Sequence, residues 1–418
     1  MKTQKNQEVI SVVHPICCAL DIHKKSISAC LLTLDENGNE VEHLRQFETY
    51  TDSILELKDW LNQYDCPIVA MESTGVYWKP VHNILEDVCE VVLVNARHVK
   101  NLPGKKTDVK DSRWLASLLK HGLLKGSFIP PKQVRQWRDL TRLRKKHVQT
   151  ANSFKQRTQK FLESANIKLD SVLSDLFGAS GRCLLDRLAK GEIPSQEEIA
   201  RIVHHSVRGK SYELYRSIQG FFTAHHVVLL RTNLETIDFH TRMIQRLDEQ
   251  IKNMMTDMEP LIQALDQIPG INEVSARAIL AEIGFSLDEF KTGAHLCSWS
   301  GLCPGNNQTG GKRKNGRSPV KKHVLKTTMV ECAWAGIKKK GSYYKAKYHR
   351  LKSRLDSKKA IIAISHKMLQ AIYNIIKHGQ EYKELGEEHI LEQNKHAKIL
   401  NLHKQAAHFG FKLVPIEA

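Results

Sequence analysis

Four carboxylates in the first part of the chain stand where an acidic side chain can do chemistry. Asp21 falls inside the apolar run CCALDI, where an unpaired carboxylate is expensive to desolvate unless a cation or a donor meets it. Glu72 ends the apolar run IVAME just before a Ser-Thr-Gly segment, at the expected edge of a sheet. Asp108 and Asp111 are three residues apart at an expected helix start, so they face one side, near the positive end of the helix dipole.

Convergent carboxylate oxygens of this kind suit Mg²⁺, with Mn²⁺ as a possible substitute. Two such ions about 4 Å apart bind both the attacking and the leaving oxygen of an in-line phosphoryl transfer. For Asp108 and Asp111 alone, helix capping is an equally good explanation. The four acids in this order favour a two-metal site, to which we assign both the catalytic and the metal-binding role.

The elements that must position these carboxylates are expected between residues 15 and 129. The order of apolar runs and turns predicts three antiparallel strands, then helix, strand, helix, strand and helix. In such a ribonuclease H-like sheet the first and fourth strands lie side by side and the last helix crosses them. The Asn37-Gly38 pair is expected to supply the positive φ angles of a tight hairpin. The expected segments are 15–23, 26–34, 40–49, 52–63, 66–72, 76–86, 90–95 and 111–124.

The rest of the chain is predicted to be mainly helical, which makes the fold class α/β plus α. We expect a nuclease-like domain at 1–129, a helical, coiled-coil region at 130–259, a C-terminal domain at 260–380 and a charged, partly helical tail at 381–418. The segment 167–220 looks helical and suggests no function.

Two long helices are expected in the second region, at 132–163 and 226–258, paired as an antiparallel arm. On the first helix, Val134, Trp137, Leu140 and Leu143 recur at spacings of three, which predicts one buried face.

The C-terminal domain is expected to open with a helix-hairpin-helix-like element around Pro269 and Gly270. Such a turn presents backbone N–H groups to a DNA phosphate at a helix N-terminus. Any helical hairpin can contain Pro-Gly, so packing is an equal alternative for Gly270.

Charge points to a polyanionic partner. Lys and Arg number 63 against 45 Asp and Glu, a formal net charge of +18, as expected for a protein that binds nucleic acid. The first long helix is predicted to grip a nucleic-acid backbone, although RNA and DNA cannot be told apart at this point. The residues assigned to this role are Arg135, Arg138, Arg142, Arg144, Lys145 and Lys146.

Cysteine usage and hydropathy suggest a cytoplasmic protein. The nine cysteines include no C-x-x-C pair, so we expect reduced thiols acting as small apolar residues. The chain shows no secretory leader and no apolar run long enough to span a bilayer, so no membrane partner is expected. The doublets His204/His205 and His225/His226 are not expected to bind metal, because adjacent helical residues face different ways.

Four motifs together resemble a known group, the Asp-Glu-Asp-Asp transposases of insertion-sequence family 110, particularly its 1111 subgroup. The motifs are ALDIHKKSISACLL, VAMESTGVYWKPV, KNLPGKKTDVKDSRWLASLL and GLCPGNNQTGGKRKNGR. The resemblance spans about residues 16 to 380.

The resemblance implies a RuvC-like nuclease domain, a coiled-coil insertion and a C-terminal transposase domain with a nucleophilic serine. It further implies a bacterial, nucleoid-associated recombinase that moves its element through a circular intermediate. Its partners would be double-stranded donor and target DNA and a structured noncoding bridge RNA whose loops pair with both. The working form would be a homo-oligomer, a dimer or more particularly a tetramer.

One residue departs from the family pattern. The family serine lies in P-G-N-N-x-S-[AG]-G-K, and Thr309 holds that place here. Its extra methyl group crowds the approach to phosphorus. Ser318 is a weaker candidate, while Ser298 and Ser300 fall in an apolar run and are expected to pack or cap.

The implied chemistry is attack by Thr309 on the phosphate held by the four carboxylates and Mg²⁺. A 5'-phosphothreonyl link forms, and the freed 3'-hydroxyl of the other strand later resolves it. Neighbouring cations would neutralise phosphate charge, although flexible basic loops are often only solvated. These candidates are Lys105, Lys106, Lys312, Arg313, Lys314 and Arg317.

Two other readings stay open. One is a RuvC-like, metal-dependent, structure-selective DNA nuclease that uses water as the nucleophile. The other is a catalytically inactive, nucleic-acid-binding remnant of a transposase. The long C-terminal motif domain argues against the first, and the intact carboxylate quartet argues against the second.

Overall fold

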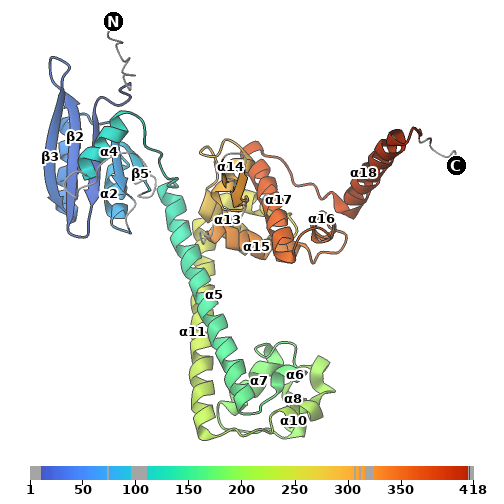
Figure 1. Ribbon diagram of the computed structural model, residues 1–418. Helices are drawn as coiled ribbons and strands as arrows, with labels where there is room; N and C mark the ends of the chain where they lie inside the picture. The colour runs from blue at the N-terminus through green and yellow to red at the C-terminus, as the bar shows by residue number, and fades with distance from the viewer. Residues whose placement is uncertain are drawn as a thin grey trace. The chain divides into compact units, whose positions relative to one another are not determined.

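The computed structural model divides the chain into two compact units, Met1–Lys132 and Gln133–Ala418, and each is described by itself (Figure 1). The described residues are 11–72, 75–95, 111–305, 307–309, 312–315, 323–412 and 414.

The first unit is built on a five-stranded mixed sheet in the order β3-β2-β1-β4-β5. Strand β1 pairs antiparallel with β2 and parallel with β4, and β4 pairs parallel with β5. This order confirms the expected succession of strands and helices, including the contact between the first and fourth strands. The elements are β1 (Cys17–Ile22), β2 (Ser26–Leu34), β3 (Glu40–Glu48), α1 (Thr51–Gln63), β4 (Ile68–Glu72), α2 (Trp78–Leu85), β5 (Glu90–Val94) and α4 (Asp111–Lys120).

The two faces of the sheet are covered by different helices. Alternate residues of a strand point to opposite faces, so Leu20 and Met71 pack on the side of α1 and α2, with Leu57 and Leu85. The intervening residues of the same strands form the core under α4. That second cluster contains Cys17, Ala19, Ile68, Ala70, Leu115, Ala116 and Leu119.

The hairpin between β2 and β3 forms as expected, but its turn is stabilised differently from the prediction. Gly38 has φ +80°, whereas Asn37 has no positive φ. The carboxylate of Asp35 instead accepts backbone N–H bonds from Asn37 (2.9 Å) and Asn39 (2.7 Å). The side chain of Asn39 also donates to this carboxylate (3.1 Å), and this bond, followed by the backbone bonds, holds the pKa of Asp35 below its ordinary value.

In the second unit, α5 (Lys132–Ser164) and α11 (Ala224–Met254) are the two long helices, and they lie side by side (Figure 1). Arg144 pairs with Asp248, and Nδ1 of His147 lies 2.8 Å from Nδ1 of His240. The residue farther along α5 contacts the residue that comes earlier in α11, so the two helices run antiparallel, as expected. A short 3₁₀ turn, η2 (Thr256–Met258), follows α11.

One detail of the α5 prediction is wrong. Val134 and Trp137 are buried, but Leu143 is 47% exposed. A helix has 3.6 residues per turn, so residues spaced by three do not stay on one side of it. Leu143 lies nine residues after Val134, which is two and a half turns, and therefore faces the opposite side.

The segment between the two long helices is helical, as expected, and forms its own core. Buried leucines such as Leu184, Leu185 and Leu188 pack against Leu162 of α5 and Leu230 of α11. The short helices are α6 (Leu169–Val172), α7 (Ala179–Leu188), α8 (Gln196–Ile202), α9 (His205–Arg208) and α10 (Ser211–Ser217).

Four of the remaining helices, α12, α14, α15 and α16, pack against α17, whose buried residues include Ile364, Met368 and Ile372. Gly379 ends α17 with φ +62°, the left-handed conformation in which glycine commonly ends a helix. None of the helices in the described ranges is long and apolar enough to cross a bilayer. The elements are α12 (Glu259–Asp266), α13 (Glu273–Ile283), α14 (Gly293–Trp299), β6 (Asn307–Thr309), β7 (Lys312–Asn315), α15 (Val324–Gly336), α16 (Tyr343–Lys352), α17 (Ser357–His378) and α18 (Gly386–His408).

The basic segment 304–322 contains a short hairpin. Strands β6 and β7 pair antiparallel, with Thr309 opposite Lys312. Strands of three and four residues are too short to be predicted from an alternating apolar pattern.

Candidate active site

Asp21 and Glu72 lie at the same end of two neighbouring strands. Leu20 of β1 pairs with Met71 of β4 in parallel register, and the two acids are the next residues of their strands. Neighbouring strands are about 4.8 Å apart, and residues in register share a face. Strand pairing thus brings the first two predicted carboxylates to one edge.

These two acids lie on the sheet face that α4 covers. Asp21 lies an even number of residues from Cys17 and Ala19 along β1, and Glu72 lies an even number from Ile68 and Ala70 along β4. These four apolar residues belong to the core under α4. Asp21 and Glu72 therefore continue this buried layer to the sheet edge.

The C-terminal end of α4 lies beside the segment that precedes β1. The carbonyl of Lys120, the last residue of α4, accepts hydrogen bonds from the backbone N–H groups of Val13 and His14, which precede β1. The helix therefore starts at the end that is farther from Val13 and His14. Asp111 is the first residue of α4.

Two ion pairs fix α4 across the sheet. Arg113 bonds Glu42 of β3 through Nε (2.7 Å) and Nη2 (2.6 Å), and Lys120 pairs with Glu40 of the same strand. Asp108, Lys105 and Lys106 were assigned to the loop before this helix and lie outside the described residues.

His23 is a residue that the sequence analysis missed. Its Nε2 lies 3.2 Å from Oδ2 of Asp21, and the Asp21 side chain is 20% exposed. Residues two apart in an extended segment share a side, so the spacing Asp-x-His was the available signal. His23 is thus placed to orient the carboxylate of Asp21.

The donor set at this edge fits a hard divalent cation. Asp21 and Glu72 supply carboxylate oxygens from adjacent strands, and such oxygens are the ligands that Mg²⁺ and Mn²⁺ take in proteins. Within the described residues, no three His, Cys, Asp or Glu side chains group together as metal ligands.

The candidate nucleophile lies in the second unit. Thr309 is the last residue of β6, and Lys312, Arg313 and Lys314 lie on β7. Arg317 and Ser318 lie outside the described residues. Ser300 is fully buried and donates to the carbonyl of Cys297 (2.9 Å), which agrees with the packing role expected for it.

The cysteines do not add a nucleophile in the sheet. Cys17, Cys30 and Cys66 are buried, and all nine cysteines are free. Burial raises the pKa of Cys17 to about 12, so the thiol stays protonated at neutral pH.

Several arginines assigned to nucleic-acid binding are engaged inside the protein. Glu282 of α13, whose side chain is only 2% exposed, accepts two hydrogen bonds from Arg142, one from Nε (2.8 Å) and one from Nη2 (2.9 Å). Arg138 donates to the backbone carbonyls of Ala281 and Glu282. Burial lowers the pKa of Arg138, and the hydrogen bonding of Arg142 to Glu282 raises the pKa of Arg142.

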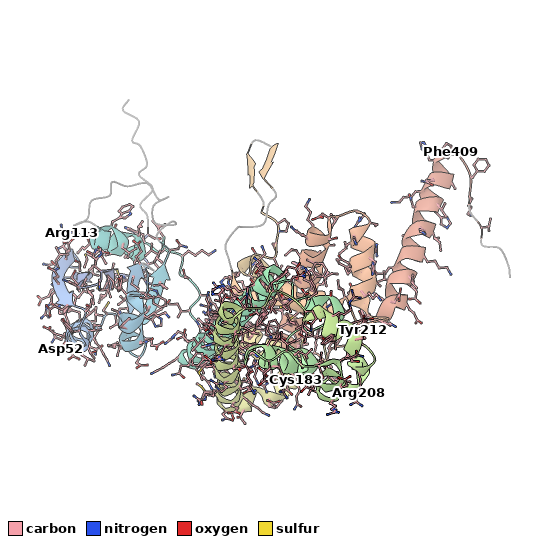
Figure 2. The ribbon with its side chains drawn as sticks, turned by 90° about the horizontal axis from the view of Figure 1, so that it is seen from below. Asp52, Arg113, Cys183, Arg208, Tyr212 and Phe409 are labelled. Carbon is pink, nitrogen blue, oxygen red and sulfur yellow. The ribbon has the colours of Figure 1, made fainter. Side chains whose placement is uncertain are left out.

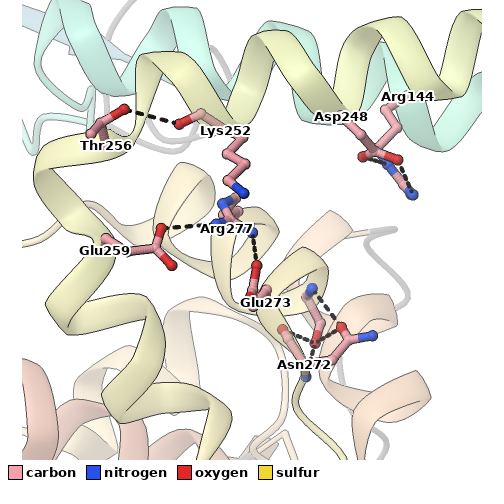
Figure 3. Close-up of polar contacts among 9 residues, drawn as sticks. Arg144, Asp248, Lys252, Thr256, Glu259, Asn272, Glu273 and Arg277 are labelled. Atoms are coloured by element: carbon pink, nitrogen blue, oxygen red, sulfur yellow. Dashed lines mark hydrogen bonds and ion pairs between the residues drawn. The ribbon is translucent and has the colours of Figure 1, made fainter.

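The next residues along α5 are also paired. Arg144 donates to Asp248 through Nη2 (3.0 Å), and Lys145 contacts Thr328 and Glu331 of α15 (Figure 3 shows the first pair). Lys146 is exposed and Arg135 half-buried. These basic residues of α5 therefore connect helices, because Arg142 pairs with an acid of α13 and Arg144 pairs with an acid of α11.

Gly270 has a packing reason to be glycine. Its φ is +90°, and a Cβ there would lie 2.3 Å from the carbonyl oxygen of Cys332 and from the nitrogen of Gly336 on α15. Close contact with a helix backbone thus explains the residue without any DNA.

The N-terminus of α13 is likewise occupied by its own side chains. The side chain of Asn272 accepts the backbone N–H of Ser275 (3.0 Å), and the carboxylates of Glu259 and Glu273 pair with Arg277 (both 2.9 Å; Figure 3). An acid in the first turn disfavours a nearby phosphate.

A mixed sheet with two carboxylates at one edge, followed by a mainly helical unit, agrees with the class of metal-dependent phosphoryl-transfer enzymes. Residues 18–167 match a DEDD-type transposase family model, and residues 262–349 match the model of the transposase IS116/IS110/IS902 family. The two matches fall in the expected order and cover more than half of the chain. The chain belongs to the IS110 transposase family.

A curated relative agrees with these matches. The chain is 24% identical to a "Probable family 20 transposase" of Pseudomonas aeruginosa over 287 residues, which cover 68% of this chain and 75% of the relative. The DEDD type of the nuclease domain implies a divalent metal.

Proposed function

We propose that this transposase is a site-specific DNA recombinase of the 1111 subgroup, in which Asp21, Glu72, Asp108 and Asp111 hold Mg²⁺ or Mn²⁺ and Thr309 is the nucleophile. The observation that carries the proposal is the register of β1 and β4, which sets Asp21 beside Glu72 on the sheet face that α4 covers. We assign the first unit to a RuvC-like nuclease domain, because its strand order accounts for the two carboxylates at one edge of the sheet.

Each group has a distinct part in the proposed reaction. Asp21 and Glu72 would hold the metal, which would supply Lewis acidity at the scissile phosphate. His23 orients the carboxylate of Asp21. The hydroxyl of Thr309 loses its proton and bonds to phosphorus, and the departing 3'-oxygen is protonated, which leaves a 5'-phosphothreonyl link.

The later half of the reaction reverses this transfer. The 3'-hydroxyl of another strand attacks the phosphothreonyl phosphorus, Thr309 leaves, and a new phosphodiester bond joins the strands. No external energy source is needed, because one phosphodiester bond is exchanged for another.

The proposed partners are donor and target duplexes, a structured bridge RNA and further copies of the chain. The net charge of +18 supports a polyanionic partner. For contact with nucleic acid we retain all the residues assigned above, with the exposed Lys146 and the β7 cations as the leading ones and Gly270 and the paired arginines of α5 as the weakest. We also retain a coiled-coil insertion at 130–259 between a nuclease domain at 1–129 and a transposase domain at 260–380.

The test is capture of the covalent intermediate. Purified protein is incubated with Mg²⁺, RNA transcribed from the DNA flanking its gene, and labelled substrate DNA, and the protein-linked DNA is digested and analysed by mass spectrometry. We expect the adduct at Thr309. Thr309→Ala abolishes it, while the matched variant Thr309→Ser keeps it, because serine retains the hydroxyl and removes the crowding methyl group.

The same experiment separates the alternatives. Cleavage without protein-linked DNA, with full activity in Thr309→Ala, identifies the water-dependent nuclease. Unchanged recombination in Asp21→Ala contradicts both enzyme readings. Omitting the RNA tests guidance separately, since an RNA-independent recombinase keeps its activity.

A further inference from the structure

The segment that leads into α16 and forms it carries positive charge that is arranged differently from the charge of α5. Between Glu331 and Asp356 the chain has no acid. Among the described residues, no carboxylate forms an ion pair with a cation of this segment, whereas cations of α5 pair with acids. These charges are therefore available to the phosphates of a polyanion. The cations are Lys338, Lys339, Lys340, Lys345, Lys347, Arg350, Lys352 and Arg354.

A pocket of about 400 Å³ lies beside these cations, where α16, α17 and the linker 379–385 meet. Three tyrosines and three side-chain amides make up half of its lining, and the rest consists of two lysines, one glutamate and three apolar residues. The tyrosines are Tyr343, Tyr344 and Tyr382, and the amides are Gln370, Asn374 and Gln380.

The linker wall of this pocket is fixed to α16 by one carboxylate. Glu384 accepts the backbone N–H groups of Tyr343 (2.9 Å) and Gly386 (3.1 Å) and the hydroxyl of Tyr382 (3.1 Å). Beyond its first turn, α18 points away from α16 and α17, with Phe409 near its far end (Figure 1 and Figure 2). In the described chain the pocket is thus shaped by its own hydrogen bonds, and the helix that follows does not line it.

The lining fits a nucleobase. Aromatic side chains stack on unpaired bases, and side-chain amides offer both donors and acceptors to the edge of a base. Lys347 joins this lining to the cations of 338–354, because its Nζ donates to the hydroxyl of Tyr343 (2.7 Å) and lies 5.1 Å from the centre of the same ring. Base recognition and phosphate neutralisation are thus both provided by α16 and the elements packed against it.

We propose that this pocket receives an unpaired nucleotide of a bound nucleic acid, with the base against the tyrosines and amides and the adjoining phosphates on the cations of 338–354. A paired base is stacked in its duplex and does not enter such a pocket. The loops of an RNA and single-stranded DNA offer the same chemistry, and the experiment separates these two sources. The proposal rests on the nucleic-acid partner of the proposed function, and on neither Thr309 nor the metal.

The first test locates the base. The full chain, without added metal, is irradiated with a short oligouridine or oligothymidine strand that carries one 5-iodouracil, and the adduct is mapped by mass spectrometry. We expect the adduct at Tyr343 or Tyr382, and the strand that gives the stronger adduct identifies the source. The same DNA strand annealed to its complement is expected to give no adduct in the pocket.

The second test removes one ring. By fluorescence anisotropy with the preferred strand, we expect Tyr343→Leu to weaken binding about tenfold and Tyr343→Phe to stay within about twofold of the wild type, because stacking needs the ring and not the hydroxyl. Tyr212→Leu is the matched control. Tyr212 is 57% exposed on α10 (labelled in Figure 2) and also has a cation, Arg216, 5.9 Å from the centre of its ring. Thermal unfolding checks that each variant is folded.

The third test measures the contribution of the cations. Lys339→Gln with Lys340→Gln removes two exposed charges of the segment, and Lys190→Gln with Lys210→Gln removes two exposed charges elsewhere. Each phosphate contact of a single strand adds about 0.7 to the slope of log affinity against log salt concentration. We therefore expect the slope to fall by up to about 1.4 in the first double variant and to stay nearly unchanged in the second.

Four results overturn the proposal: adducts only at residues outside the pocket, an equal pocket adduct from the duplex, equal losses in Tyr343→Leu and Tyr212→Leu, or equal salt slopes in the two double variants. Failure of the proposed nucleophile is distinguishable from these results, because Thr309→Ala is expected to bind and cross-link as the wild type does. A missing covalent DNA adduct at Thr309 therefore leaves the pocket result intact, and a missing pocket adduct leaves the role of Thr309 intact.

Discussion

Carboxylates are held in two contrasting ways at the sheet edge and at the junction of α5 with α13. Asp21 stands at the end of a strand with a histidine at 3.2 Å, while Glu282 is buried between Arg138 and Arg142. The buried acid is compensated by permanent cations of its own chain. The difference teaches that burial with full pairing marks an architectural carboxylate, and that placement at a strand end leaves an acid available to a metal.

The sharpest test of this contrast is Asp21→Asn. We expect strand cleavage to fall by about 10²–10³-fold, the range seen when one transition-state stabilising group is removed, with little change in the unfolding temperature. Cleavage assays and calorimetry on the same preparation measure both. Glu90→Gln, an exposed acid of β5, is the control, and equal losses in the two variants would contradict the special role of Asp21.

Glu282→Gln should show the opposite pattern, lower stability with a smaller effect on chemistry. It leaves two partly buried guanidinium groups without their counter-charge, which costs about 3 kcal/mol. Denaturant unfolding at neutral pH measures this loss. Glu331→Gln removes an exposed partner of Lys145 and is expected to cost less than about 1 kcal/mol; comparable losses would show that Glu282 is not an architectural acid.

Gly270→Ala tests whether the Pro-Gly turn belongs to the architecture or to a DNA contact. The added methyl group meets the backbone of α15 at 2.3 Å and forces alanine to φ +90°, so we expect a loss of about 2 kcal/mol. Thermal unfolding checks it, with Gly209→Ala, where a Cβ meets nothing within 4 Å, as control. A fully stable variant with weakened DNA binding would return Gly270 to the nucleic-acid interface.

The smallest expected effect is a pH dependence from the imidazole pair on the two long helices. Desolvation, and then the charge of His147, lower the pKa of His240 in the folded state. The unfolded chain therefore binds more protons just below its ordinary value of about 6.5, and stability falls as the pH drops through that value. Urea midpoints from pH 8 to 5 measure this, and His240→Gln should flatten the curve; an unchanged curve would exclude the pair as its source.

Much of the sheet unit could be predicted from local pattern. Apolar runs such as IVAME and CCALDI are strands in the structure because strand formation here depends on burying short apolar segments. The pairing of the first and fourth strands followed from element order alone. Hydrophobic periodicity and turn-forming residues were also sufficient to predict the helix ends near Gln63 and Gly379.

Tertiary contacts decided the rest. Nothing in the sequence around Arg138 or Arg142 reveals that Glu282, about 140 positions away, neutralises them, and nothing near Gly270 announces the backbone of α15. A residue type states which interactions a side chain is able to make, and distant parts of the chain determine which it makes. Local sequence pattern is enough for the acidic motif, its strands and the basic character of the chain. Only the folded chain shows that Arg138, Arg142 and Arg144 of α5 pair with acids of other helices, because their partners lie far away in the sequence.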